Sequence, residues 1–223
     1  MGGEGLRLKP LTNDRPKAMV EVGGRPLVDW VLRWLAKNGI ENVVMGVAYR
    51  KEKIIDHVGG GERYDVRVQY SHHTTEGGTA QGFRWAIQRY VNDECFVAMN
   101  GDELTNVNLQ DLAAYHIAKG GTATVAISPL RSPFGVVGVQ GEDIVGFQEK
   151  PVIDSLLVSV GVYAFRKDIL DYLPESGDIE KTAFPRLAAE GRLKAYRHNG
   201  FWMTINTMKD LYEVDQRIRE MSF

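Results

Sequence analysis

The first stretch of the chain combines glycines with cations in a pattern suited to holding phosphate groups. Residues 2–7 read GGEGLR, and Lys17 follows in the segment RPKAM. Glycines let backbone N–H groups approach an anion closely, arginine can donate two parallel hydrogen bonds to a phosphate, and lysine adds a mobile positive charge. The stretch lacks the Gly-Lys-Ser/Thr of a Walker loop and the spacing of a dinucleotide fingerprint. It indicates an anion-binding loop of another kind, the alternative being a glycine-rich turn with solvated cations.

A carboxylate stands where a later run of apolar residues ends. The run CFVAMN reads as a strand and leads directly into Gly101 and Asp102. Ligands of parallel α/β sheets bind beyond the carboxyl ends of the strands, and Mg²⁺ usually takes one or two carboxylates with phosphate oxygens and waters. Asp102 is therefore a candidate magnesium ligand, the alternative being an aspartate that caps a turn.

Two further motifs have weaker chemical signals. In FQEKP, Glu149 and Lys150 stand at an expected strand end before Pro151. The lysine could hold a second phosphate and the glutamate could bind sugar hydroxyls, but an exposed ion pair is the simpler interpretation. His72 and His73 are adjacent, so on an extended segment they point to opposite faces. We interpret them as loop residues rather than metal ligands.

The order of apolar runs predicts the elements that must position these residues. Strands are expected at 42–48, 65–70, 95–100 and 122–128, and helices at 26–39, 79–91 and 108–121, the last with Asn108 as its N-cap. Strands that alternate with helices predict a mostly parallel sheet covered on both faces. The second half predicts a hairpin over 134–151, a strand over 156–165, a helix over 178–191 interrupted by Pro185, and a strand over 192–198. A capping box from Thr207 to Asp210 starts the last helix.

Length and composition limit the classes of function. The chain has 223 residues and a net charge of −2, so it offers no global basic field for nucleic acid. It contains no apolar run of the roughly 20 residues that span a bilayer, and Cys95 is the only cysteine, so no internal disulfide forms. No linker or repeat interrupts the sequence. We expect a single cytoplasmic enzyme domain over 1–223.

Taken together, the motifs resemble the sugar-1-phosphate nucleotidylyltransferases, also called NDP-sugar pyrophosphorylases. The resemblance runs, in order, through GGEGLRLKPLT with PKAM, GGRPLVDWVLRWLAKNGI, EGGTAQGF, NGD, FGVV, EKP, VGVYAF, IEKTAFPRLAAEG and GFW. It implies a Rossmann-like three-layer α/β/α fold with a mostly parallel mixed sheet. It also implies that a nucleoside triphosphate reacts with a sugar-1-phosphate to give an NDP-sugar and pyrophosphate. Such enzymes need Mg²⁺ and are possible homo-oligomers.

The resemblance assigns roles to individual residues of this sequence. Gly3, Gly5 and Arg7 are expected to cradle the triphosphate, and Lys17 to stabilise charge on the α-phosphate. Gly78 is expected against the base and ribose, and Asp102 on the magnesium ion. The sugar-phosphate residues implied by the resemblance are Gly135, Glu149, Lys150, Gly161 and Glu180.

The sequence departs from the family pattern at several positions. Leu6 replaces the usual Ser or Thr, and Ser159 stands where an Asn usually contacts the sugar. The carboxylate that usually supplies a second metal ligand after the GFW motif is missing, which leaves the neutral Thr204 or Asn206 as candidates. These departures favour an alternative function, a regulatory homologue that binds nucleotide or nucleotide sugar without turnover. A related glycosyltransferase is a third possibility, but the sequence reads DEL where such enzymes carry an Asp-x-Asp pair.

The family's first strand also has no counterpart before the glycines. This strand lies at the centre of the sheet, so its absence is expected to leave two strands with unpaired edges and a hole in the core. We expect either that the sequence starts late or that another segment fills the slot.

Overall fold

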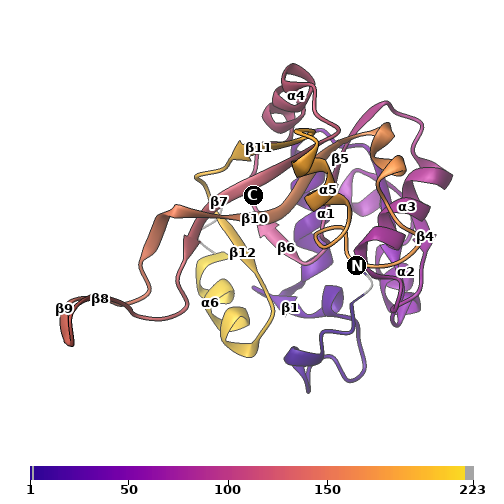
Figure 1. Ribbon diagram of the computed structural model, residues 1–223. Coiled ribbons are helices and arrows are strands. Elements are labelled where there is room, and N and C mark those ends of the chain that lie inside the picture. The colour runs from indigo at the N-terminus through magenta and orange to yellow at the C-terminus, as the bar shows by residue number, and fades with distance from the viewer. Residues whose placement is uncertain (2, 219–223) are drawn as a thin grey trace.

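The computed structural model describes residue 1 and residues 3–218, in which strands and helices alternate along the chain (Figure 1). The strands are β1 (Glu21–Val22), β2 (Arg25–Pro26), β3 (Asn42–Val47), β4 (Arg67–His72), β5 (Cys95–Met99), β6 (Glu103–Thr105), β7 (Ala123–Arg131), β8 (Val136–Gln140), β9 (Asp143–Gln148), β10 (Val152–Arg166), β11 (Leu193–Arg197) and β12 (Trp202–Thr204). The α-helices are α1 (Leu27–Lys37), α2 (Lys51–Val58), α3 (Gly78–Tyr90), α4 (Leu109–Lys119), α5 (Ala183–Ala189) and α6 (Met208–Ile218). Short 3₁₀ helices are η1 (Leu6–Leu8), η2 (Lys17–Met19), η3 (Glu62–Tyr64) and η4 (Lys167–Asp171).

Strand β10 separates the two halves of the core. The sheet runs β11-β7-β10-β5, with β11 parallel to β7 and β10 antiparallel to both of its neighbours. Successive side chains of a strand point to opposite faces. Val160 and Val162 accordingly pack with α1 and α4, whereas Tyr163 and Phe165 pack with α3 and α5. Helices therefore cover both faces of a mixed sheet, which confirms the predicted three-layer α/β fold.

The sheet is interrupted between β3 and β5. Strand β3 pairs in parallel with β4, and β5 pairs with β10, and in the described ranges neither strand has a second neighbour. A cavity of about 890 Å³ is lined by Val43 and Val44 of β3, by residues 95–99 of β5, and by α1 and α3. The predicted pair of unpaired edges is confirmed, and no segment among residues 1 and 3–218 fills the slot.

Most predicted elements agree with the structure, but the helix predicted over 178–191 begins later in the structure than the sequence pattern indicated. Helix α5 starts only at Ala183, and residues 179–182 form turns. Proline lacks the N–H and clashes with the preceding turn in a helix interior, but its ring fits the first turn. Pro185 therefore lies near the start of the helix rather than interrupting it.

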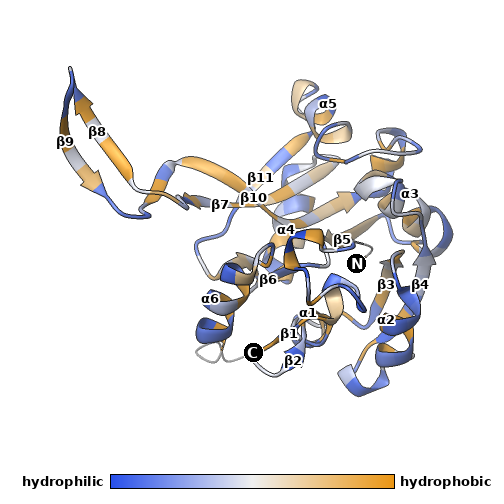
Figure 2. Cartoon of the chain, turned by 90° about the horizontal axis from the view of Figure 1, so that it is seen from below, coloured by the Kyte–Doolittle hydropathy of each residue, from blue (hydrophilic) through white to orange (hydrophobic). Residues whose placement is uncertain are grey.

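The predicted hairpin forms, and it stands apart from the body. Strands β8 and β9 pair across a two-residue turn at Gly141 and Glu142. In both views the hairpin ends a long arm that projects from the rest of the molecule (Figures 1 and 2). We call residues 129–157 the arm.

No helix in the described part of the chain is long and apolar enough to cross a membrane.

Candidate active site

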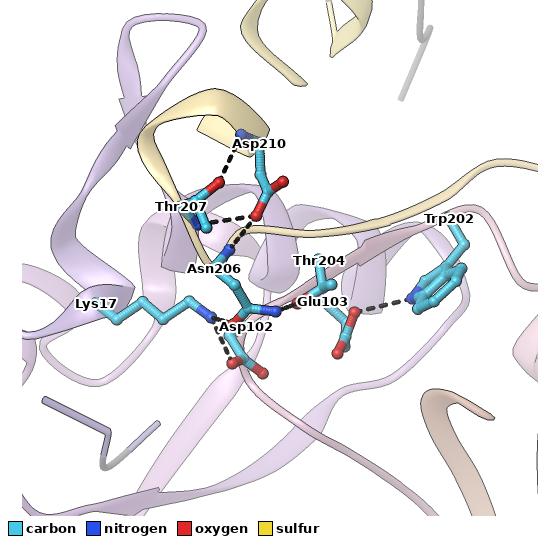
Figure 3. A network of polar contacts seen from close by, with 8 residues as sticks. All are labelled: Lys17, Asp102, Glu103, Trp202, Thr204, Asn206, Thr207 and Asp210. Carbon is cyan, nitrogen blue, oxygen red and sulfur yellow. Dashed lines mark hydrogen bonds and ion pairs between the residues drawn. The ribbon is translucent and has the colours of Figure 1, made fainter. Parts of the chain in front are cut away.

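A buried lysine connects the two loops that carry the candidate metal ligands. The Lys17 side chain is nearly buried, and its Nζ donates to Asp102 Oδ2 over 2.7 Å and to Asn206 Oδ1 over 3.0 Å (Figure 3). Lysines are almost never buried unless they are paired. The three side chains come from positions far apart in the sequence, so the tertiary fold has assembled one polar cluster.

The pairing of two short strands brings Asp102 and Asn206 together. Strands β6 and β12 are antiparallel, with Glu103 opposite Thr204. The residue before β6 and the residues after β12 therefore lie at the same end of this ladder. Lys17 begins η2, whose turn is closed by the Val20 N–H donating to the Lys17 carbonyl over 3.1 Å.

Asp210 fixes the backbone of Asn206 rather than joining the cluster. Its Oδ2 accepts hydrogen bonds from the N–H groups of Asn206 (2.9 Å) and Thr207 (2.8 Å). The Asp210 N–H is in turn bonded to Thr207 Oγ1 over 3.2 Å. This reciprocal arrangement is the predicted capping box, and it places the Asn206 amide beside Asp102. Thr204 lies one step away, accepting from Asn206 Nδ2 over 3.3 Å.

A second carboxyl group lies buried behind Asp102. Glu103 Oε2 accepts from the Trp202 indole over 2.8 Å. Burial, and then the neighbouring Asp102 carboxylate, raise the pKa of Glu103 to about 8. A Cβ on Gly161 would lie 2.8 Å from Glu103 Cγ, so only glycine lets this strand pass so close to the glutamate. The protonated form of Glu103 is therefore favoured at neutral pH.

A pocket of about 360 Å³ lies beside this cluster. Four of the predicted site residues line it: Gly3, Lys17, Gly78 and Asp102. The remaining wall includes Gly46, His73, Thr79, Gly82, Phe83, Met99, Asn100 and Asp178. A cation, a carboxylate and glycines thus surround one cavity at the carboxyl ends of β3 and β5, where ligands of α/β sheets bind.

The start of α3 forms one wall of the pocket in a way that requires glycine. Gly78 has a φ of +69°, and a Cβ there would lie 2.3 Å from the Gly177 carbonyl oxygen. That oxygen accepts from the Ala80 N–H over 2.9 Å, and the Gly177 N–H donates to the Gly77 carbonyl over 2.9 Å. Two chain segments therefore meet backbone to backbone at this wall.

Glu180 adjoins the same wall. Its carboxylate accepts from Thr79 Oγ1 over 3.0 Å and from the Tyr163 hydroxyl over 3.3 Å. Burial, together with the Glu180 charge, raises the pKa of Tyr163, which keeps its hydroxyl a donor. Thr79 lines the pocket. Glu180 therefore contacts the pocket wall through its hydrogen bond with the Thr79 hydroxyl.

The other predicted residues lie outside the pocket wall. Gly5 packs beside it, since a Cβ there would lie 3.2 Å from Lys17 Cβ, whereas Arg7 is exposed on η1. Gly135, Glu149 and Lys150 belong to the arm and do not line the pocket. The fold thus brings Gly3, Lys17, Gly78 and Asp102 to one pocket, leaves Gly5 and Arg7 outside its wall, and leaves three residues predicted for the sugar phosphate on the arm.

Sequence reasoning missed several residues of the pocket wall. His73 lines it, with ring atoms 3.4 Å from a Cβ built on Gly46 and 3.5 Å from one built on Gly82. Burial lowers the pKa of His73, so its neutral form is favoured. A glycine inside a strand often marks a site where another group approaches the backbone closely. Gly46 within β3 was therefore the sequence signal that could have indicated a neighbour such as His73. His72 is exposed on β4.

Comparison with known proteins settles the family. The profile described as nucleotidyl transferase matches residues 1–221, which include every residue of the pocket. The chain belongs to the nucleotidyl transferase family.

Several relatives of this nucleotidyl transferase are named for sugar phosphates. The mannose-1-phosphate guanylyltransferase catalytic subunit beta of Dictyostelium discoideum is 34% identical over 217 residues, which cover 94% of this chain and 60% of the relative. The "Probable glucose-1-phosphate cytidylyltransferase" of Bacillus subtilis (strain 168) is 30% identical over 243 residues, covering 96% of this chain and 92% of the relative. The chain thus spans about 60% of the length of the guanylyltransferase it matches.

A solved structure supports the fold of this nucleotidyl transferase. HddC from Yersinia pseudotuberculosis, crystallised with GMP-PN, superposes with a TM-score of 0.76 at 20% sequence identity. The match covers 97% of this chain and 96% of HddC. The α/β architecture is therefore shared over nearly the entire length.

The oxygen atoms of Asp102 and Asn206 suit a hard cation whose other ligands are water molecules and phosphate oxygens. The described residues contain no group of three or more His, Cys, Asp or Glu side chains able to hold a metal. Within them, the Asp102 carboxylate and the Asn206 amide oxygen both accept hydrogen bonds from the Lys17 ammonium. Carboxylate and amide oxygens are ligands of Mg²⁺, which keeps waters and phosphate oxygens in its remaining positions.

Proposed function

We propose that this nucleotidyl transferase joins a nucleoside triphosphate to a sugar-1-phosphate and releases pyrophosphate. The observation that carries the proposal is the buried Lys17 ammonium, shared by Asp102 and Asn206 at the wall of the pocket. The names of two relatives give further support: one is a mannose-1-phosphate guanylyltransferase catalytic subunit, and the other is named a probable glucose-1-phosphate cytidylyltransferase.

The proposed reaction requires charge stabilisation rather than a protein nucleophile. A phosphate oxygen of the sugar-1-phosphate attacks the α-phosphorus and forms a new P–O bond. The bond from the α-phosphorus to the oxygen bridging to the β-phosphorus breaks, and that oxygen leaves with pyrophosphate. Catalysis then depends on alignment and on neutralising the charge that develops on the α-phosphate. In this scheme Lys17 supplies the positive charge.

The nucleotide side of the site follows from the pocket wall. The backbone around Gly3 and Gly5 is proposed to hold the β- and γ-phosphates, with Arg7 close to the departing pyrophosphate. The pocket wall at Gly78 is proposed to lie against the base and ribose. Backbone groups exposed by glycines can approach a ligand closely.

The sugar side combines residues of the body with residues of the arm. Glu180 is proposed to accept hydrogen bonds from sugar hydroxyls, and the backbone at Gly161, which packs closely against Glu103, is proposed to approach the sugar. Lys150 is proposed to hold the phosphate of the sugar-1-phosphate, with Glu149 on the sugar and Gly135 giving close backbone approach.

Magnesium is proposed to bind to Asp102, with Asn206 as the second protein ligand. When bound, the ion would reduce repulsion between the reacting phosphates. Asn206 is preferred to Thr204 because its amide oxygen shares the Lys17 ammonium with Asp102, whereas the Thr204 hydroxyl faces Asn206 Nδ2.

A pyrophosphate-release assay tests this function. The purified chain is incubated with magnesium and each pair drawn from GTP, CTP, UTP and dTTP and from mannose-1-phosphate and glucose-1-phosphate. We expect release with at least one pair and none when either substrate is omitted. Absence of release with every pair, while a nucleotide binds in calorimetry, contradicts the proposal.

That same outcome favours the second candidate, a homologue that binds nucleotide or nucleotide sugar without turnover. The neutral Asn206 at the second ligand position is the observation in its favour. The intact pair of Lys17 and Asp102 favours the enzyme.

A further inference from the structure

A buried tyrosine joins two separate segments beside the pocket. Tyr163 lies on β10 and is only 1% exposed, and its ring stacks on that of Phe165 with the ring centroids 5.5 Å apart. Its hydroxyl lies 3.3 Å from the Asn100 amide nitrogen and 3.3 Å from the Glu180 carboxylate. Asn100 follows β5 and lines the pocket, whereas Glu180 lies in the turns before α5 and contacts Thr79 of the pocket wall. One hydroxyl group therefore connects two segments that are far apart in the sequence.

The chemistry of these partners fixes the direction of each hydrogen bond. A carboxylate has no proton to donate, so Tyr163 must donate its single hydroxyl proton to Glu180 Oε1. The Tyr163 oxygen can then act only as an acceptor toward Asn100. Asn100 consequently turns its amide nitrogen, which is the donor end of the side chain, toward Tyr163.

The amide oxygen of Asn100 is left for a ligand. The Asn100 backbone is held in place, because its N–H donates to the Gly161 carbonyl over 2.8 Å just beyond the paired part of β5 and β10. A planar amide that presents its nitrogen to one neighbour presents its oxygen elsewhere. Within the part of the chain that the structure describes, no group donates a hydrogen bond to Asn100 Oδ1. The pocket wall therefore offers an acceptor at Asn100 rather than a donor.

The opposite orientation of this amide would suit a different part of a substrate. The two ends of an asparagine amide have nearly the same shape, so packing alone does not choose between them. With the nitrogen toward the pocket, the wall would offer N–H donors to the oxygens of a phosphate group. With the oxygen toward the pocket, it offers an acceptor to a hydroxyl group and none to a phosphate, which has no proton to donate. Tyr163, whose own direction is set by Glu180, decides between the two.

We propose that Tyr163 is a positioning residue, which orients Asn100 so that its amide oxygen accepts a hydrogen bond from a hydroxyl group of the bound substrate. This hydroxyl belongs either to the ribose of the nucleotide or to the sugar of the sugar-1-phosphate, and the experiment below separates the two. The inference rests on the proposed function only for the identity of these substrates, since the direction of the hydrogen bonds follows from the structure.

Calorimetry on Tyr163→Phe tests the role of the hydroxyl. The variant keeps the aromatic ring and removes only the oxygen. Each nucleoside triphosphate and each sugar-1-phosphate of the release assay is titrated separately into the wild type and the variant. We expect either the nucleotide or the sugar-1-phosphate to bind about threefold to tenfold more weakly to the variant, the usual effect of losing one uncharged hydrogen bond. The class of ligand that is weakened carries the hydroxyl group. Unchanged binding of both classes overturns the proposal.

Tyr172→Phe is the matched control. The Tyr172 hydroxyl contacts Glu190 and Arg192 and belongs to no residue of the pocket wall, so this variant is expected to bind both classes of ligand as the wild type does. Circular dichroism follows the thermal unfolding of both variants. Both are expected to unfold close to the wild type, because Asn100 is half-buried and Glu180 is exposed, so water can replace the contact that is lost.

A double-mutant cycle tests whether Tyr163 acts through Asn100. Asn100→Ala removes the acceptor and is expected to weaken the same ligand at least as much as Tyr163→Phe does. The double variant is expected to bind no more weakly than Asn100→Ala alone, since the orientation of the amide no longer matters once the amide is gone. Losses that add up show that the two residues act independently and overturn the proposal. Wild-type binding of both classes of ligand by Asn100→Ala overturns it as well.

The release assay keeps this inference separate from the proposed function. In an active enzyme, Tyr163→Phe is expected to raise the KM of the affected substrate while kcat changes little, as for a contact that the ground state and the transition state share. A wild type that binds ligands but releases no pyrophosphate rejects the proposed reaction, and the calorimetric comparison still decides the role of Tyr163. A wild type that binds neither class of ligand overturns both proposals.

Discussion

Lys17 Nζ and Asp102 Oδ2 lie 2.7 Å apart, although the two residues are separated by 85 positions in the sequence. Lysine side chains rarely tolerate burial, and here the side chain is only 10% exposed while Asp102 remains 39% exposed. The ammonium is thus fixed at the wall of the pocket, and the carboxylate retains a face that a ligand can reach.

Replacing Lys17 tests the source of positive charge. Lys17→Ala is expected to lower kcat by about 10²–10³-fold, the usual cost of removing a group that stabilises transition-state charge. Steady-state pyrophosphate release measures this effect. Lys51→Ala, an exposed lysine at the start of α2, is the matched control and is expected to retain wild-type rates. Equal rates for both variants would show that Lys17 has no catalytic role.

Adding a carboxylate at Asn206 tests the second metal ligand. Asn206→Asp is expected to lower the half-saturating magnesium concentration on the order of tenfold, because carboxylates bind Mg²⁺ more strongly than neutral amides. Calorimetry with Mn²⁺ or Mg²⁺ gives a readout that does not depend on activity. Thr204→Asp is the comparison and is expected to change binding little, since this side chain lies behind Asn206. A stronger effect at 204 than at 206 would reverse the assignment.

A methyl group at Gly78 tests the backbone contact at the pocket wall. Gly120 also has a positive φ, but nothing lies within 4 Å of a Cβ built there. Gly120→Ala is therefore expected to cost about 1–2 kcal/mol of unfolding free energy from backbone strain alone. Gly78→Ala is expected to cost clearly more, because its Cβ would collide with the Gly177 oxygen. Urea unfolding of the two variants measures the difference, and equal values would mean that the two segments separate easily.

His116 is expected to make the fold sensitive to acid. It is buried, its Nδ1 is bonded to Thr124 Oγ1 over 2.8 Å, and Nε2 has no hydrogen-bond partner among the residues that the structure describes. Burial first, and then the nearby Arg166, lower the pKa of His116, against a smaller opposing effect of Asp168. The unfolded chain therefore binds the proton more readily. This contribution to stability is complete above the unfolded pKa of about 6.5. It is lost as the pH falls toward the lower folded value.

The measurement is the unfolding free energy between pH 7.5 and 5. The expected loss is about 1.4 kcal/mol for each unit by which the pKa is lowered. His116→Gln, which replaces the imidazole with an amide that can form hydrogen bonds but cannot titrate, is expected to reduce that loss. The exposed His72→Gln serves as the control. A variant at 116 with the same pH dependence as the wild type would assign the effect to other groups.

The sequence was sufficient for features that depend on local chemistry. The Asn108 cap of α4 and the Thr207–Asp210 capping box both appear where the pattern placed them. Each is decided within one turn of chain, so residue type and spacing contain the information. Where the local rule had two outcomes, as for Pro185, the sequence placed the start of the helix wrongly.

The sequence by itself determined an alternating α/β chain whose glycines, Lys17 and Asp102 suit a phosphate and a metal. Only the tertiary structure decided that Asn206 rather than Thr204 shares the Lys17 ammonium with Asp102, because that arrangement depends on the pairing of β6 with β12. The structure also decided that the pocket wall includes His73 and that Lys150, on the arm, does not line it. These relationships join residues far apart in the chain. They are stabilised by side-chain packing and strand pairing between distant segments, which a local sequence pattern does not predict.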